Sequence, residues 1–160
     1  KSGNQPIYSD DKNLVLAANG EIYNHRSLRE KSKNYNFTTN SDCEIILALY
    51  KENGVRFFDE LNGIFAFVLY DNKKDSFLIA RDHIGIIPLY MGWDKMGTLF
   101  IASELKALER YCNKIKIFPP GHFLTPTLKK PKKWYKRDLM KFKNISNNKT
   151  DLSLLKESLE

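Results

Sequence analysis

Two short runs of β-forming residues, at positions 64–70 and 76–80, most restrict the fold of this chain. Both are rich in aromatic and branched aliphatic side chains, and the polar segment 71–75 between them is typical of a hairpin turn. A second pair of runs, at 88–92 and 98–102, has the same arrangement. Because hairpins join these strands, the sequence predicts antiparallel sheet rather than parallel sheet with helical crossovers.

Helical segments are predicted on both sides of these hairpins. Upstream, one helix is expected at 24–31, and the clearest helix of the chain runs from Asp42, as its N-cap, to a stop at Asn53 and Gly54. Downstream, residues 104–112 also have helical character. The sequence therefore predicts an α+β fold in which helices cover the faces of antiparallel sheets.

The chain is expected to divide into three parts. Residues 1–125 hold the strands and helices, residues 126–150 are predicted to form a basic linker, and residues 151–160 begin the helix of a following domain. This last helix has one apolar face, made by Leu152, Leu155 and Leu159. Because it stops in mid-course and the chain does not begin with Met, we expect further residues at both ends.

Composition excludes several classes of protein. Of the 160 residues, 42% are hydrophobic and 28% are charged, which is close to the average of globular proteins and unlike disordered or fibrous ones. No apolar run approaches the roughly 18 residues of a membrane span, and the start of the chain has no apolar signal core. We therefore expect a soluble, cytoplasmic protein without a membrane partner.

The net charge of +7 comes from one segment, between Lys129 and Lys143. It holds eight basic residues against a single acid, Asp138, so the rest of the chain is close to neutral. Phosphate binding, with Trp134 and Tyr135 as stacking partners, is one interpretation of this segment. A solvated loop beside a domain boundary is the other. Because the remaining sequence is neutral, no nucleic-acid partner is expected.

Candidate chemistry is concentrated after the apolar run 14–18. The Asn19 amide and the Gly20 N–H can donate hydrogen bonds to one developing oxyanion. The alternative is a tight Asn-Gly turn that ends a buried strand. Asp42 is likewise either a helix N-cap or a carboxylate that faces the ammonium group of a ligand, and Glu21 on its own is typical of a solvated surface acid.

Neither the cysteines nor the histidines form a recognisable site. Cys43 is predicted to be a packing residue and, with Cys112, a free thiol, although one bridge between the two stays open. His83 follows Arg81 and Asp82 in a loop, where a structural role for the Arg-Asp pair is favoured. The three histidines lack the spacing of a zinc site, so no metal site is predicted.

Six segments, taken in order, resemble the class II glutamine amidotransferase domain of asparagine synthetases, in the superfamily of N-terminal-nucleophile hydrolases. They lie within residues 3–125 and are NGEIYNH, SDCE, LNGIFAF, RDHIGIIPLY, ASE and PG. The resemblance implies two antiparallel sheets between helices. It also implies that Asn19 and Gly20 form the oxyanion hole, and that Glu21 and Asp42 hold the ammonium group of L-glutamine.

The resemblance further implies groups that these residues do not contain. The family's nucleophile is an N-terminal cysteine whose α-amino group acts as the base, and an upstream arginine binds the substrate carboxylate, whereas this chain begins with Lys1. We therefore expect the isolated 160-residue chain to be inactive. A synthetase domain of the same polypeptide, with ATP and magnesium, is implied to make L-asparagine from L-aspartate. Its Ser-Gly-Gly-x-Asp-Ser loop is not in this sequence, so no cofactor is expected in this segment.

Two other functions stay open from the sequence. The chain could be the glutaminase half of a different amidotransferase, with another acceptor substrate. It could also be a non-catalytic binding or regulatory module whose basic segment, Lys129 to Lys143, contacts an acidic partner. A homodimer is compatible with each of these functions.

Overall fold

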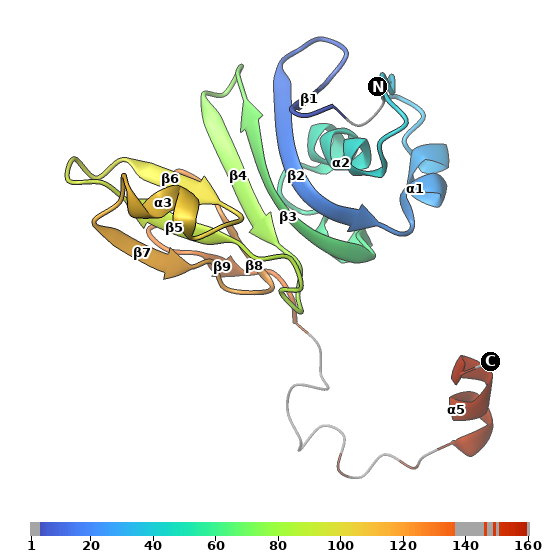
Figure 1. The fold of residues 1–160 in the computed structure, drawn as a ribbon. Coiled ribbons are helices and arrows are strands. Elements are labelled where there is room, and N and C mark those ends of the chain that lie inside the picture. Colours follow the sequence, from blue (N-terminus) through green and yellow to red (C-terminus); the bar gives the residue numbers. More distant parts are fainter. Residues whose placement is uncertain (1–3, 137–145, 147–148, 150, 160) are drawn as a thin grey trace.

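The computed structural model describes residues 4–136, 146, 149 and 151–159, and its main feature is a pair of antiparallel sheets (Figure 1). The larger sheet has six strands in the order β1-β2-β3-β4-β8-β9, and the smaller has three in the order β6-β5-β7. The strands are Ile7–Tyr8 (β1), Leu14–Ile22 (β2), Gly63–Asp71 (β3), Ser76–Arg81 (β4), Tyr90–Trp93 (β5), Leu99–Ala102 (β6), Lys114–Ile117 (β7), His122–Leu124 (β8) and Lys132–Lys133 (β9).

Both predicted hairpins are present. In the first, β3 pairs with β4, and Asp71 lies opposite Ser76 beside the turn. In the second, β5 pairs with β6. Asp75 and Gly97, with φ of 45° and 85°, supply the left-handed backbone conformation that such turns require.

Strand β2 is longer than predicted and contains no turn at Asn19 and Gly20. All nine of its residues pair with β3, as far as Ile22 opposite Gly63. Gly20 has a φ of +143°, which residues with a side chain rarely adopt, so glycine accommodates a local distortion while the pairing continues. The prediction that an Asn-Gly turn ends this strand was therefore wrong.

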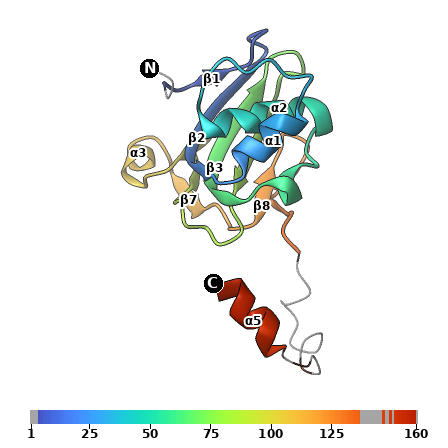
Figure 2. The ribbon, with the colours of Figure 1, turned by 90° about the vertical axis from the view of Figure 1, so that its right-hand side faces the viewer.

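Helices α1 (His25–Lys31) and α2 (Ile45–Asn53) lie on the same face of the larger sheet (Figure 2). Residues 45–50 of α2 are all buried, so this helix is the centre of that layer. Gly54 follows it with φ 60°, and its N–H donates to the Tyr50 carbonyl, which ends the helix as predicted. The remaining helical elements near the sheets are η1 (Asp42–Glu44), η2 (Phe58–Glu60) and α3 (Lys106–Glu109), the last being shorter than predicted.

Two clusters of buried apolar side chains join these layers. The larger cluster connects the helices to the larger sheet and includes Ile46 and Leu16. The smaller cluster has members from both sheets, among them Ile79 of β4 and Met91 of β5. Antiparallel sheets with flanking helices are thus present, which confirms the predicted α+β class.

The packed body continues beyond residue 125, where the sequence predicted a linker. Strand β9 pairs with β8, and Trp134 stacks on Phe58 with ring centroids 5.2 Å apart. The first part of the basic segment therefore belongs to the sheet and its core. Residues 137–143 of that segment lie outside the described residues.

The last described element is helix α5 (Leu152–Leu159), drawn apart from the sheets in Figure 1. The Asp151 carboxylate accepts hydrogen bonds from the N–H groups of Ser153 and Leu154, at 2.9 and 3.2 Å, and so begins this helix as predicted. Within the described residues, no helix combines the length and the apolar character that a bilayer span requires.

Replacing Trp134 with leucine is expected to lower the free energy of unfolding by about 2 kcal/mol. The change removes aromatic packing against Phe58 and the hydrogen bond from Nε1 to the Arg81 carbonyl, 3.2 Å long. Urea denaturation followed by circular dichroism measures the effect. The control is Lys133→Ala, at an exposed neighbouring position, which should shift stability by less than about 0.5 kcal/mol. Equal midpoints for the two variants would contradict a core role for Trp134.

Candidate functional site

Asn19, Gly20 and Glu21 lie near the end of β2, where the strand alternates the direction of its side chains. Asn19 and Glu21 are exposed, whereas Ala18 and Ile22 are buried on the helical side of the sheet. The two predicted polar groups therefore share the face that is turned away from α1 and α2. Their orientation follows from the pairing of β2 rather than from a loop.

Gly20 makes an unusually close approach to the neighbouring strand. A Cβ atom on Gly20 would lie 2.1 Å from the Ile64 carbonyl oxygen, and one on Gly63 would lie 2.2 Å from the Glu21 carbonyl oxygen. Two glycines, one on each strand, thus allow β2 and β3 to come together here. A side chain at Gly20 would clash with the backbone and would also strain its φ.

Asp42 is brought to the end of β2 although it lies twenty positions after Ile22. Its Oδ2 atom accepts a hydrogen bond from the Ile22 N–H at 2.7 Å. The predicted N-cap role was wrong: Ser41 precedes η1, Glu44 precedes α2, and neither helix has a side-chain cap. The physical reason is that a 3₁₀ turn separates Asp42 from α2, and its carboxylate is used by the sheet.

Glu44 is a fully buried acid that fixes the loop leading to Asp42. One carboxylate oxygen accepts hydrogen bonds from the N–H and hydroxyl of Thr38, at 2.7 and 3.1 Å, and the other accepts from those of Thr39, at 2.7 and 2.6 Å. Arg29 Nη2 lies 3.5 Å from the same carboxylate. These partners compensate the buried charge, so the loop is held in one arrangement.

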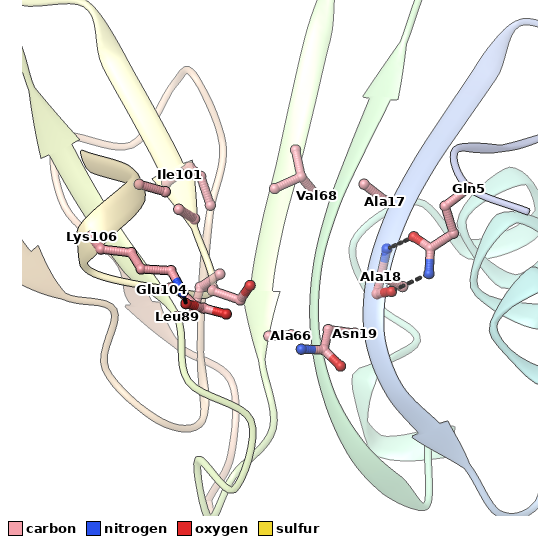
Figure 3. Close-up of a pocket in the computed structure, with 13 residues that line it drawn as sticks. Gln5, Ala17, Ala18, Asn19, Ala66, Val68, Leu89, Ile101, Glu104 and Lys106 are labelled. Atoms are coloured by element: carbon pink, nitrogen blue, oxygen red, sulfur yellow. Dashed lines mark hydrogen bonds and ion pairs between the residues drawn. The ribbon is translucent and has the colours of Figure 1, made fainter. Parts of the chain in front are cut away.

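A cavity of about 520 Å³ lies between β2 and β3 on one side and the smaller sheet on the other (Figure 3). Asn19 lines it, and Figure 3 shows the side chain of Asn19 pointing toward Ala66 of β3. The small side chains of Ala17 and Ala66 line the same wall, while Leu89 and Ile101 form an apolar opposite wall. The Asn19 amide is thus a polar group beside apolar walls, which is suited to orient one polar atom of a ligand.

Gln5 and the Glu104–Lys106 pair complete the lining of this cavity. The Gln5 amide accepts from the Ala18 N–H at 2.7 Å and donates to the Ala18 carbonyl, which ties the start of the chain to β2. Glu104 and Lys106 form an exposed ion pair with 2.6 Å between Oε2 and Nζ, which contributes little to stability.

Cys43 is buried next to the predicted acids. Its Sγ lies 3.9 Å from the Gly20 carbonyl oxygen and 3.8 Å from Asp42 Oδ2. Burial raises the pKa of this thiol to about 12, and the negative charges of Asp42 and Glu21 act in the same direction. Cys43 is thus protonated at neutral pH and serves as a packing residue, as predicted. Cys43 and Cys112 are both free thiols.

The structure therefore brings the Gly20 carbonyl and the Asp42 carboxylate to one buried thiol, while Glu21 is exposed at the end of β2 and Asn19 lines the cavity. In the described part of the chain, no hydrogen bond or ion pair joins Asn19 to either acid. Nor do the described residues contain a group of three or more His, Cys, Asp or Glu side chains placed to hold a metal ion.

Arg81 and Asp82 have the structural role that the sequence favoured. The Arg81 guanidinium donates to three carbonyl groups at 2.7 to 2.8 Å, those of Gly85, Ile87 and Phe118. Asp82 Oδ1 accepts from the N–H groups of residues 84–86. Both side chains bind backbone, which differs from the expected Arg-Asp ion pair. His83 stacks on Tyr135 with ring centroids 4.3 Å apart.

Sequence reasoning missed Glu44 and Gln5. For Glu44 a signal was available, because it directly precedes the apolar run 45–50 of the predicted helix, and an acid that is buried beside such a run needs partners. Thr38 and Thr39 offer those partners. For Gln5 no local signal exists, since its contact with Ala18 depends on how the chain returns to β2.

Comparison with known proteins gives matches in sequence. The family model for the glutamine amidotransferase domain matches residues 1–110. Asparagine synthetase B (glutamine-hydrolysing) of Escherichia coli strain K12 is 51% identical over 160 residues, which are 99% of this chain and 29% of that protein. The chain thus spans less than a third of the length of the curated relatives that it matches.

Two solved structures have a similar fold. An allosteric regulatory enzyme of purine biosynthesis matches with a TM-score of 0.69 and 25% identity, over 85% of this chain and 32% of that chain. Glutamine phosphoribosylpyrophosphate amidotransferase from B. subtilis matches with a TM-score of 0.63 and 26% identity, over 80% and 30% of the two chains.

Replacing Glu44 with glutamine is expected to lower the free energy of unfolding by about 3 kcal/mol. An amide NH₂ would then face threonine donors, and Arg29 would lose its charged partner. Thermal and urea denaturation test this expectation. Asp59→Asn, at an exposed acid, is the matched loss of one charge and should have little effect. Unchanged stability of Glu44→Gln would contradict the anchoring role.

Alkylation should distinguish the two thiols of the folded chain. With a pKa of about 12, only about one Cys43 thiol in 10⁴ is ionised at pH 8, and the side chain is buried. We expect iodoacetamide to modify the partly exposed Cys112 at least about tenfold faster than Cys43, as measured by peptide mass spectrometry. In urea the two rates should become similar. Equal rates in the folded chain would refute the burial of Cys43.

Proposed function

The chain belongs to the glutamine amidotransferase domain family, with the fold of the N-terminal-nucleophile hydrolases, and from this membership we propose that it binds L-glutamine for hydrolysis of the side-chain amide. We propose further that the parent protein is an asparagine synthetase, in which the released ammonia converts aspartate to asparagine. The 51% identity to the E. coli enzyme supports aspartate as the acceptor of the ammonia, rather than the acceptor substrate of a different amidotransferase.

In the proposed reaction, Asn19 and Gly20 stabilise the oxyanion that forms when the amide carbon is attacked. Asn19 lines the cavity, and Gly20 follows it in β2, where its missing side chain lets the backbone of β3 come close. Pairing of β2 with β3 fixes both groups before substrate arrives, so little reorganisation accompanies the chemical step.

Glu21 and Asp42 are proposed to hold the ammonium group of glutamine. The placement of the Asp42 carboxylate beside Gly20, the neighbour of Glu21 in β2, is the observation that carries the proposal, because Cys43 Sγ lies 3.9 Å from the Gly20 carbonyl oxygen and 3.8 Å from Asp42 Oδ2, and a carboxylate favours a cation. The hydrogen bond from the Ile22 N–H fixes Asp42 through one oxygen. A substrate held by two fixed acids presents its side-chain amide in one orientation.

The attacking thiol is proposed to come from an N-terminal cysteine of the parent protein, as the family resemblance implies. Cys43 is unsuited because its thiol is buried and its pKa is raised to about 12. Cys112 packs behind Gly92 of the smaller sheet, where a Cβ on that glycine would lie 2.5 Å from its sulfur. Burial also raises the pKa of Cys112.

The activation of aspartate is proposed to occur in a synthetase domain of the same polypeptide, with ATP and magnesium. In this organisation the amidotransferase part extends beyond the predicted residues 1–125 to β9 and Trp134, and residues 151–160 begin the second part. No residue described above is assigned to ATP or magnesium.

Asp42→Asn in the protein that contains this chain is expected to raise the KM for glutamine at least about tenfold. Asparagine retains an oxygen that can accept the Ile22 N–H, so the substitution removes charge with little change of shape. Asparagine formation is measured with aspartate and ATP, once with glutamine and once with ammonium chloride as nitrogen donor. The ammonia-dependent rate should stay close to that of the unchanged protein.

Asp59→Asn serves as the control for loss of an exposed acid and should leave both rates unchanged. Equal loss of both activities in Asp42→Asn would count against an ammonium-binding role. Absence of asparagine formation with either donor, in the unchanged protein, would overturn the proposed acceptor.

A further inference from the structure

A second cavity, of about 320 Å³, shares no lining residue with the cavity that Asn19 faces. Strands of both sheets contribute to it, together with the segment 124–131 that leads from β8 towards β9. None of the residues assigned to glutamine lines this second cavity. It is therefore a separate feature of the fold.

The floor of the second cavity is apolar and partly open to solvent. Met91 and Trp93 alternate along β5, so their side chains share one face, and Leu99 lies opposite Trp93 on β6. Phe77 and Leu128 extend this floor. Met91 is itself a buried member of the smaller apolar cluster. The other four side chains pack against that cluster and are half-buried. A flat apolar group that covered them would gain from the removal of this surface from water.

Four exposed lysines surround this floor. Lys114 and Lys116 lie on β7 directly opposite Trp93 and Met91, so they project from the same face of the sheet. Lys129 and Lys130 belong to the segment between β8 and β9. No Asp or Glu lines the cavity, and among the described residues none of the four lysines takes part in an ion pair.

The positive charge of this cavity is a product of the fold. Lys129 and Lys130 begin the basic segment of the sequence, but Lys114 and Lys116 come from a different strand. Pairing of β7 with β5 and of β4 with β8 brings the two groups to one cavity. Four unpaired ammonium groups beside an apolar floor disfavour a cation and favour an anion.

We propose that this cavity is a second ligand site, which binds a small anion with one aromatic ring system and a phosphate group, the chemistry of a mononucleotide. The ring covers Trp93 and its apolar neighbours, and the lysines bind the phosphate. Lys114 Nζ now lies 5.8 Å from the Trp93 ring centroid, and its flexible side chain can move from the ring to the phosphate. The volume is at the lower end of the range for small-molecule sites.

Calorimetric titration of the 160-residue chain tests this proposal with three probes: AMP, adenosine and inorganic phosphate. AMP should bind with a Kd below about 1 mM at low salt, and adenosine and phosphate should each bind at least about tenfold more weakly, because each carries only half of the recognised chemistry. Binding of AMP should weaken as salt is raised, since the lysines are exposed.

Two variants locate the site. Lys114→Gln combined with Lys130→Gln should weaken AMP binding at least about tenfold, whereas Lys33→Gln combined with Lys95→Gln, an equal loss of charge at exposed lysines outside the cavity, should not. Trp93→Leu should weaken AMP binding and leave phosphate binding unchanged. Circular dichroism checks that each variant remains folded.

Several results would overturn the proposal. Absence of any binding heat with AMP up to about 5 mM would exclude the site. So would an equal loss of AMP affinity in the double variant at Lys114 and Lys130 and in the control at Lys33 and Lys95. Phosphate binding as tight as AMP binding would refute the aromatic part, and so would unchanged AMP binding in a folded Trp93→Leu. Because none of these variants changes Asn19, Glu21 or Asp42, these outcomes are independent of the glutamine reaction.

Discussion

The pairing of β2 with β3 is the constraint on which the rest of the structure depends. Nine consecutive residue pairs fix the register, and a slip by one residue would turn every side chain of β2 to the opposite face. Leu16 and Ile22 would then leave the core, in which both are fully buried. The burial of apolar residues on one face therefore orients Asn19 and Glu21 on the other.

The second half of the candidate site is held by different physics. Buried hydrogen bonds to Glu44, rather than apolar packing, define the loop before η1, and one hydrogen bond from the Ile22 N–H to Asp42 joins that loop to the strand. The strand and the loop are thus anchored separately, and they meet where Asp42 contacts the Ile22 N–H and Cys43 contacts the Gly20 carbonyl. A substitution that disturbs the pairing of β2 with β3, or the hydrogen bonds to Glu44, is therefore expected to change the distance between Asp42 and Gly20, although neither Asp42 nor Gly20 is replaced.

Much of the fold could be predicted from the sequence because local signals and final contacts agree there. The hairpins and the end of α2 at Gly54 are examples. The turn predicted at Asn19 and Gly20 failed because pairing with β3 overrides the local preference of that dipeptide. Trp134 was placed in a linker because the surrounding lysines dominate the local composition, whereas its contact with Phe58 is distant in sequence. The site residues were identified through family resemblance, since spacing alone favoured structural roles for Asn19, Gly20 and Asp42.

The two glycines at the contact of β2 and β3 limit how such a site can evolve. Because a Cβ atom at position 20 or 63 would overlap the carbonyl oxygen of Ile64 or Glu21, neither position has room for even a methyl group. A change of substrate preference cannot therefore begin at either glycine. It has to begin at neighbouring positions such as the exposed Glu21, so that the strand contact stays constant while the side chains around it diversify.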